Sequence, residues 1–234
     1  MVAIFVVMTI MAFVAIDLMI QTLERRKNAS LQPETIHHHT AGIYNLILPL
    51  VYFFHPGHTW AQVEKTGMVR VGLDSFAQKL IGNIDTIELP EVGKEVKQGQ
   101  PLFSIRQGRR SAAFVSPVNG KIASTNNHLE PNLIKKEPYS SGWIAEVEPD
   151  SLSDDLSRLK IGKDAVLWMK KEIKKFLDFS WARVPAPAIV GQTAQDGGFP
   201  VEGILETMDD ETWDHFETQF LQSRVSDDPA IFKG

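Results

Sequence analysis

Short runs of strand-forming residues, separated by turn residues, fill residues 58–147. Pairs such as Val92-Gly93 and Asn119-Gly120 favour turns between the runs. Strands this short and this closely spaced are typical of a small sandwich or barrel. Residues 75–81 interrupt the series with a brief helical pattern, so we expect a mostly β fold with a few helices. The expected strands are residues 68–72, 86–89, 101–105 and 112–115.

A longer helix is predicted between residues 164 and 177, where apolar side chains recur on one face. Its opposite face carries cations that either contact anionic lipid or solvate the helix. These cations are Lys170, Lys171, Lys174 and Lys175.

The C-terminal part begins with a connection rich in Pro, Gly and Ala at residues 180–200. Thr207 and Asp210 then form a capping box before a predicted helix. The aromatic residues Trp213, Phe216 and Phe220 share one face of that helix. The region around it, residues 202–228, is distinctly acidic.

The first twenty residues are almost wholly apolar, with Asp17 as the only charge. At about 1.5 Å per residue, such a helix nearly spans a hydrocarbon core of about 30 Å. A signal peptide and a buried soluble helix are the alternatives, but the segment lacks the basic start and cleavage site of a signal peptide. We expect a membrane helix at residues 1–22. Because Arg25, Arg26 and Lys27 follow it, the bulk of the chain should be cytoplasmic.

Residues 23–55 are expected to form a linker that contains one apolar segment, residues 43–54. That segment is too short to cross a bilayer, and it suits either the membrane interface or burial against the domain or a partner. His37, His38 and His39 also lie here. Consecutive residues of an extended segment point in different directions, so we expect no metal site.

Composition and motifs argue against several functions. The formal charge of −5 gives no drive towards nucleic acid, and no nucleic-acid-binding motif is present. With no cysteine, the chain can form neither disulfides nor thiolate metal sites. A catalytic Ser/His/Asp context, a phosphate-binding glycine loop and a zinc-binding His-Glu-x-x-His are also missing. We therefore expect no catalytic residues and no enzyme activity.

Several ordered motifs across residues 56–150 resemble the glycine cleavage H protein family, with a weaker similarity up to about residue 178. The resemblance implies a flattened β-barrel, a barrel-sandwich hybrid of the lipoyl-domain type, in agreement with the strand pattern. The matching motifs are His58-Thr59-Trp60, Val71-Gly72-Leu73-Asp74, Glu88-Leu89-Pro90-Glu91-Val92-Gly93, Ser116-Pro117-Val118-Asn119-Gly120, Pro138-Tyr139 and Gly142-Trp143.

In that family, lipoate is attached to a lysine at a β-hairpin tip, within a motif similar to Glu-Ser-Val-Lys-Ala. Counting back from Ser116 places Arg106 at the glutamate and Arg109 at the lysine, and no lysine lies between Gln98 and Asn119. A guanidinium stays protonated, with a pKa above about 12, and offers no nucleophilic lone pair. We therefore expect neither lipoate nor any other cofactor on this hairpin.

The arginines at this tip either clamp a carboxylate or phosphate of a partner or form a solvated basic turn. Together with the C-terminal aromatic residues they are the candidate partner-binding residues. These candidates are Arg106, Arg109, Arg110, Trp213, Phe216 and Phe220.

The expected organisation is a membrane helix (1–22), a linker (23–55), an H-protein-like domain with trailing helices (56–178) and a C-terminal acidic helical segment after a Pro/Gly-rich connection (179–234).

The leading hypothesis is a non-enzymatic accessory or scaffold subunit that docks other subunits of a membrane complex, such as a redox assembly. The alternative is a lipoyl carrier in glycine cleavage, one-carbon or sulfur metabolism that is modified elsewhere on the chain. A third hypothesis is a soluble regulator whose apolar terminus is removed.

Overall fold

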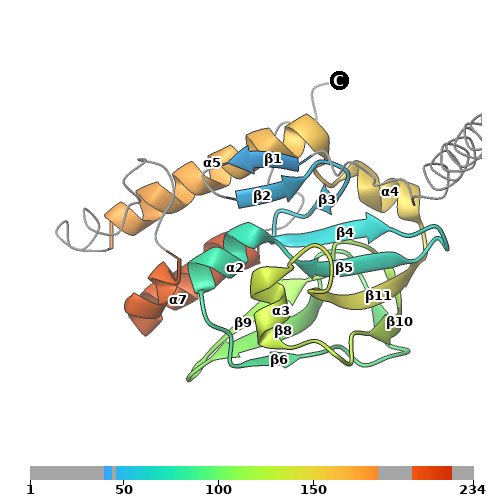
Figure 1. Ribbon diagram of the computed structural model, residues 1–234, viewed down its shortest axis with the longest axis horizontal. Coiled ribbons are helices and arrows are strands. Elements are labelled where there is room, and N and C mark those ends of the chain that lie inside the picture. Colours follow the sequence, from blue (N-terminus) through green and yellow to red (C-terminus); the bar gives the residue numbers. More distant parts are fainter. Residues whose placement is uncertain (1–39, 44–45, 184–201, 223–234) are drawn as a thin grey trace, which may run out of the picture. The chain divides into compact units, whose positions relative to one another are not determined.

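The computed structural model describes residues 40–43, 46–183 and 202–222, which belong to one unit, His39–Gly234 (Figure 1). A six-stranded antiparallel sheet has the order β3-β4-β5-β11-β10-β7, a three-stranded one the order β6-β8-β9, and β1 and β2 form a hairpin. The strands are β1 (Thr40–Ile43), β2 (Leu46–Pro49), β3 (Phe53–Phe54), β4 (Thr59–Val63), β5 (Val69–Leu73), β6 (Thr86–Glu88), β7 (Glu95–Val96), β8 (Pro101–Gln107), β9 (Arg110–Val115), β10 (Gly120–Thr125) and β11 (Trp143–Pro149).

Helices surround these sheets, and α5 is the longest of those described (Figure 1). Residues Glu217–Leu221 have π-helical geometry and continue α7 directly. The helices are α2 (Ser75–Ile81), α3 (Pro131–Lys136), α4 (Leu152–Ser157), α5 (Gly162–Trp181), η1 (Ile204–Thr207), α7 (Asp210–Phe216) and η2 (Glu217–Leu221).

The four strands expected from the sequence correspond to β5, β6, β8 and β9, and the expected helix at residues 75–81 is α2. The Asp74 side chain caps α2 by accepting a hydrogen bond from the Ala77 amide at 2.9 Å. The expected capping box before α7 is wrong. Asp209 caps that helix instead, accepting from the Thr212 amide at 2.8 Å. The Thr207 hydroxyl donates to the Ile204 carbonyl and thus serves η1.

The apolar segment at residues 43–54 contributes to the core, which is one of the two roles that the sequence left open. Leu46, Leu48 and Phe54 are fully buried. Phe54 also exchanges two backbone hydrogen bonds with Lys160, at 2.8 and 2.9 Å. The folded unit therefore includes residues before position 56.

A buried charged cluster joins the start of β4 to α2 and α5. His58 is fully buried and adopts a positive φ of 61°. Its Nδ1 lies 2.8 Å from Asp74 Oδ2, and its Nε2 faces Glu172 Oε2 at 3.8 Å, which is an ion-pair distance. The imidazole stacks on Phe76 and lies beside Trp168, with ring centroids 4.5 and 5.2 Å away.

The carboxylates determine the charge of this histidine. Burial alone would lower the pKa of His58, but Asp74 and Glu172 outweigh it and raise the pKa to about 9. Burial, with His58 as a second cause, lowers the pKa of nearby His55 to about 4. The folded chain therefore holds one protonated and one neutral histidine in its interior near pH 7.

No helix within the described ranges is both long and apolar enough to span a membrane. The membrane helix expected at residues 1–22 and the histidines His37–His39 lie outside the described residues.

Candidate functional site

The hairpin that the sequence singled out is formed by β8 and β9. Gln107 pairs with Arg110, so Gly108 and Arg109 form a two-residue tip. Gly108 has a φ of +58°, a conformation that short hairpin turns require and glycine adopts without strain. Its amide donates to Asp85 Oδ2 at 2.6 Å, which fixes the tip against the segment that precedes β6. Arg109 is thus presented at an ordered, exposed tip.

The three arginines of the hairpin have different environments. Arg106 pairs with Glu88 at 2.8 Å on the exposed face of the sheet. Arg110 turns towards the C-terminal segment, where it pairs with Asp210 at 2.7 Å and donates to the Leu205 and Met208 carbonyls. Arg109 makes no hydrogen bond or ion pair with any described residue. Two of the three guanidinium groups therefore have partners within the chain, which leaves Arg109 as the member of the group available for the clamp that the sequence left open.

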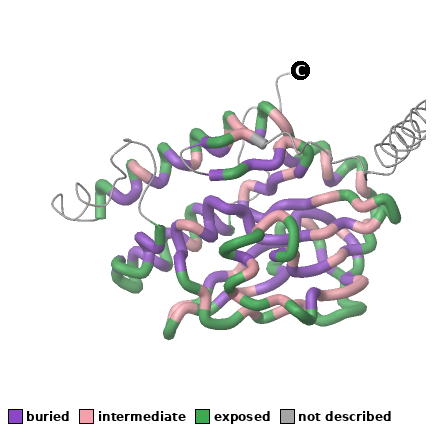
Figure 2. The backbone as a smooth tube through the Cα atoms, viewed as in Figure 1, coloured by how far each residue is buried: buried purple, intermediate pink, exposed green. Residues whose placement is uncertain are grey.

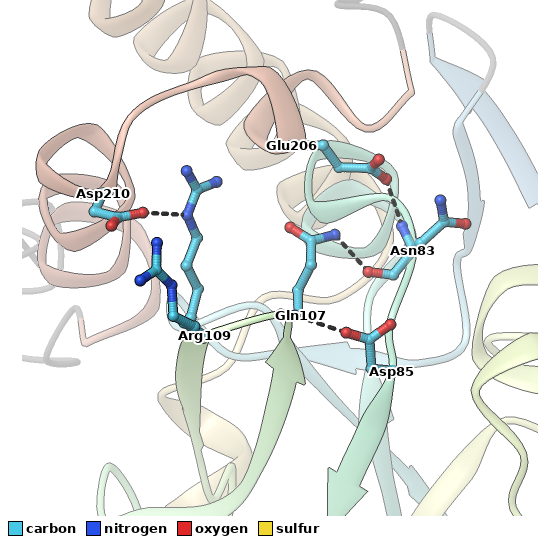
Figure 3. A pocket seen from close by; sticks show the side chains of 8 residues that line it. Asn83, Asp85, Gln107, Arg109, Glu206 and Asp210 are labelled. Carbon is cyan, nitrogen blue, oxygen red and sulfur yellow. Dashed lines mark hydrogen bonds and ion pairs between the residues drawn. The ribbon is translucent and has the colours of Figure 1, made fainter.

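A polar hollow of about 420 Å³ lies beside the tip (Figure 3). Its carboxylates already accept hydrogen bonds: Asp85 from Gly108, Glu206 from the Asn83 amide at 2.7 Å, and Asp210 from Arg110. The side-chain amide of Gln107 donates to the carbonyls of Ile81 and Asn83, while its buried Oε1 has no hydrogen-bond partner among the described residues. The lining residues are Asn83, Asp85, Gln107, Gly108, Arg109, Arg110, Glu206 and Asp210.

The hollow is lined by amides, carboxylates and guanidinium groups, which donate and accept hydrogen bonds. No cluster of three potential metal ligands is found among the residues that the structure describes. Sequence reasoning did not bring Asn83, Asp85, Gln107 and Glu206 together, because they meet only in the tertiary structure. Asn83 and Glu206 are 123 positions apart, and Asn83 and Gln107 are 24 apart.

The C-terminal segment, residues 203–221, lies along the outer edge of β9. Beyond Arg110 at the tip, the Trp213 indole donates to the Ser111 carbonyl at 3.0 Å, and the Ala113 amide donates to Glu217 Oε1 at 2.9 Å. At the far end, the Leu221 carbonyl comes so close to Gly57 that a β-carbon there would lie 2.6 Å from it. Contacts at positions 213, 217 and 221 follow the period of a helix. One side of the hairpin is therefore covered by the chain itself.

A sequence profile described as Glycine cleavage H-protein matches residues 51–172. The chain belongs to the glycine cleavage H-protein family. A probable glycine cleavage system H protein of Pyrococcus abyssi is 40% identical over 104 residues, which cover 44% of this chain and 77% of that protein. Glycine cleavage system H protein 2 of Aquifex aeolicus is 32% identical over 127 residues, covering 53% and 79%.

Among solved structures, a glycine cleavage system H protein from Mycobacterium marinum aligns with a TM-score of 0.41 and 27% identity. The alignment covers 44% of this chain and 87% of that one. The C-terminal segment that covers β9 lies outside the residues matched by the H-protein profile, as does the β1–β2 hairpin.

The aromatic candidates of the C-terminal segment are core residues in the structure. Trp213 is 1% exposed, and Phe216 and Phe220 are fully buried. Phe216 and Phe220 pack against Phe176 of α5, with ring centroids 6.0 and 5.8 Å away. Their expected exposure to a partner is therefore wrong: the shared face is apolar because it packs against the chain's own α5 and β9.

Arg110 is expected to anchor the C-terminal segment, so Arg110→Ala should destabilise the protein by about 2–3 kcal/mol. The substitution removes an ion pair, leaves two carbonyls without their donor, and removes a guanidinium 5.6 Å from the Trp213 ring. Urea unfolding measures the total effect, and hydrogen exchange of residues 204–221 locates it.

The neighbouring residue provides the matched control for this prediction. Arg109→Ala removes the same side chain from the same hairpin, and it should change stability by less than about 0.5 kcal/mol. Equal effects of the two substitutions would show that Arg110 does not anchor the segment.

Proposed function

We propose that this chain is a lipoate-free, non-catalytic member of the H-protein family that binds partner proteins rather than carrying a group between them. The single observation that carries the proposal is Arg109 at the tip of the β8–β9 hairpin, the position that motif spacing assigns to the lipoyl lysine. No lysine lies in either strand or in the turn between them.

The chemistry of attachment supports this proposal. An amide to lipoate needs an amine with a free lone pair, and a guanidinium with a pKa above about 12 does not provide one near neutral pH. Lys97 and Lys121, the lysines nearest the hairpin in sequence, belong to the turn before β8 and to β10. The protein's own C-terminal segment also covers the β9 side, which would restrict an enzyme that grips the hairpin from that edge.

The proposed setting is a membrane complex. The apolar residues 1–22 would anchor the chain, the basic residues Arg25, Arg26 and Lys27 would keep its bulk cytoplasmic, and the H-protein domain would dock other subunits. This part of the proposal rests on the amino-acid sequence. The side of the hairpin tip left open by the C-terminal segment, with Arg109 and the polar hollow, is the proposed docking region.

A lipoyl carrier is the second candidate, and the names of the relatives favour it over a membrane scaffold. Proteins 32–40% identical to the matched region are described as glycine cleavage system H proteins. If this chain shared their role, its lipoyl group would have to be attached to a lysine outside the β8–β9 hairpin.

Intact-mass measurement of the full chain purified from its natural host separates the two candidates. We expect the unmodified mass of the chain, because the hairpin has no acceptor amine. A lipoyl adduct on any residue would overturn the proposal in favour of a carrier. Identification of the proteins that co-purify from native membranes then tests the proposed setting.

A further inference from the structure

The solvent-facing side of α5 combines cations with exposed apolar side chains, in a stripe that we call the α5 face. Exposed residues recur along this helix (Figure 2). Spacings of three, four and seven residues place them on one arc of the helix. The arc contains two acids, Asp164 and Asp178. The α5 face consists of Lys163, Asp164, Leu167, Lys170, Lys171, Lys174, Asp178 and Trp181.

Lys175 does not belong to this face, although the sequence pattern grouped it with the other lysines. Its ammonium lies 3.5 Å from Glu172, 2.8 Å from the Gln219 carbonyl and 4.3 Å from the centre of the Phe220 ring. It therefore packs against the C-terminal segment at the flank of the helix. Lys163, about two turns before Lys170, takes its place in the outward stripe.

The α5 face also carries two exposed apolar side chains. Leu167 is 58% exposed and Trp181 is 50% exposed, whereas Met169, Ile173 and Phe176 on the opposite face are almost fully buried. Large apolar side chains among lysines are typical of helices that lie at a bilayer surface, where the rings and aliphatic chains enter the interface and the cations meet phosphate groups.

We propose that the α5 face is a docking surface for an anionic lipid bilayer. Charge complementarity supports the lipid, since four lysines outnumber two acids on this face, and cations are attracted to an anionic surface within a Debye length of about 8 Å. A bilayer would accommodate Leu167 and Trp181 in its interfacial region while its anionic headgroups meet the lysines. The inference is independent of residues 1–22 and of the lipoyl status of the hairpin.

A site-specific fluorescent probe tests the contact in the full chain. Because the chain has no cysteine, Leu167→Cys can be labelled uniquely with an environment-sensitive dye. We expect a blue shift with vesicles of phosphatidylcholine containing about 30% phosphatidylserine, and none with phosphatidylcholine alone. Salt near 1 M, where the Debye length is about 3 Å, should reverse the shift.

Two further variants make the test specific. Changing Lys163, Lys170, Lys171 and Lys174 together to glutamine should raise the lipid concentration for half-maximal response by at least about tenfold. The control is a dye at Val92→Cys, which is 62% exposed in a turn before β7 and should not respond.

Vesicle flotation of the same samples separates this inference from the proposed membrane anchor. Flotation with both vesicle types but no dye response at position 167 would contradict docking through the α5 face and would support an anchor at residues 1–22. A response confined to anionic vesicles, without flotation on neutral ones, would support the α5 face and contradict the anchor. Equal responses at positions 92 and 167 would also contradict the inference.

Discussion

Incubation with a lipoate ligase, ATP and lipoate is expected to leave the mass of this chain unchanged, whereas a lysine-bearing H protein gains one lipoyl group under the same conditions. The reason is chemical rather than steric: the β8–β9 tip presents the guanidinium of Arg109, which has no lone pair with which to form the amide. The readout is intact mass followed by peptide mapping of residues 98–119.

The Arg109→Lys variant tests whether the missing amine alone prevents lipoylation or whether the residues around the tip also prevent it. We expect this variant to be lipoylated far more slowly than an authentic H protein. Arg106 stands at the position of the motif's glutamate, and residues 203–221 cover the β9 edge. Modification of the wild-type hairpin at any residue would contradict the assignment of Arg109. Modification of Arg109→Lys at the rate of an H protein would show that the surroundings do not matter.

Replacement of His58 by alanine is expected to destabilise the protein by about 3–5 kcal/mol. It would leave the buried Asp74 carboxylate without its cationic partner at 2.8 Å and open a void between Phe76 and Trp168. Urea unfolding at pH 7 measures the loss. If the alanine variant does not fold, His58→Gln provides a milder test, because an amide can still donate to Asp74 but carries no charge.

The pH dependence of stability should identify the charge of His58 as the cause. The pKa of His58 is about 9 in the folded chain and about 6.5 in the unfolded chain. Its contribution to the free energy of unfolding is therefore complete below pH 6.5 and is lost as the pH rises to 9. The loss amounts to about 3 kcal/mol. His55 has the opposite effect, because its pKa in the folded chain is lowered to about 4. Its contribution to the free energy of unfolding is present above pH 6.5 and is lost as the pH falls through 4.

The His58 variants should therefore lose the alkaline decline in stability and retain the acid one. His128→Ala is the matched control, because His128 is exposed and its removal should change stability by less than about 0.5 kcal/mol. An alkaline decline that persists in both His58 variants would show that another group causes it.

Local signals determined much of the β domain from the sequence. The runs that became β5, β6, β8 and β9 were recognisable because strand and turn propensities act over a few residues, and α2 was recognisable for the same reason. Motif spacing also placed Arg109 at a hairpin tip, where the structure has it. The absence of an acceptor lysine there is a property of the amino-acid sequence itself.

Only the tertiary structure decided which surfaces remain free. An apolar helical face indicates burial but not the surface against which it is buried, and Phe216 and Phe220 were found packed against the chain's own α5. The sequence likewise does not reveal which charged side chains have partners within the chain. Arg110 and Lys175 resemble their neighbours in sequence, yet both form hydrogen bonds with the C-terminal segment. These contacts join residues about 40 to 100 positions apart, a separation at which the sequence pattern contains no local signal.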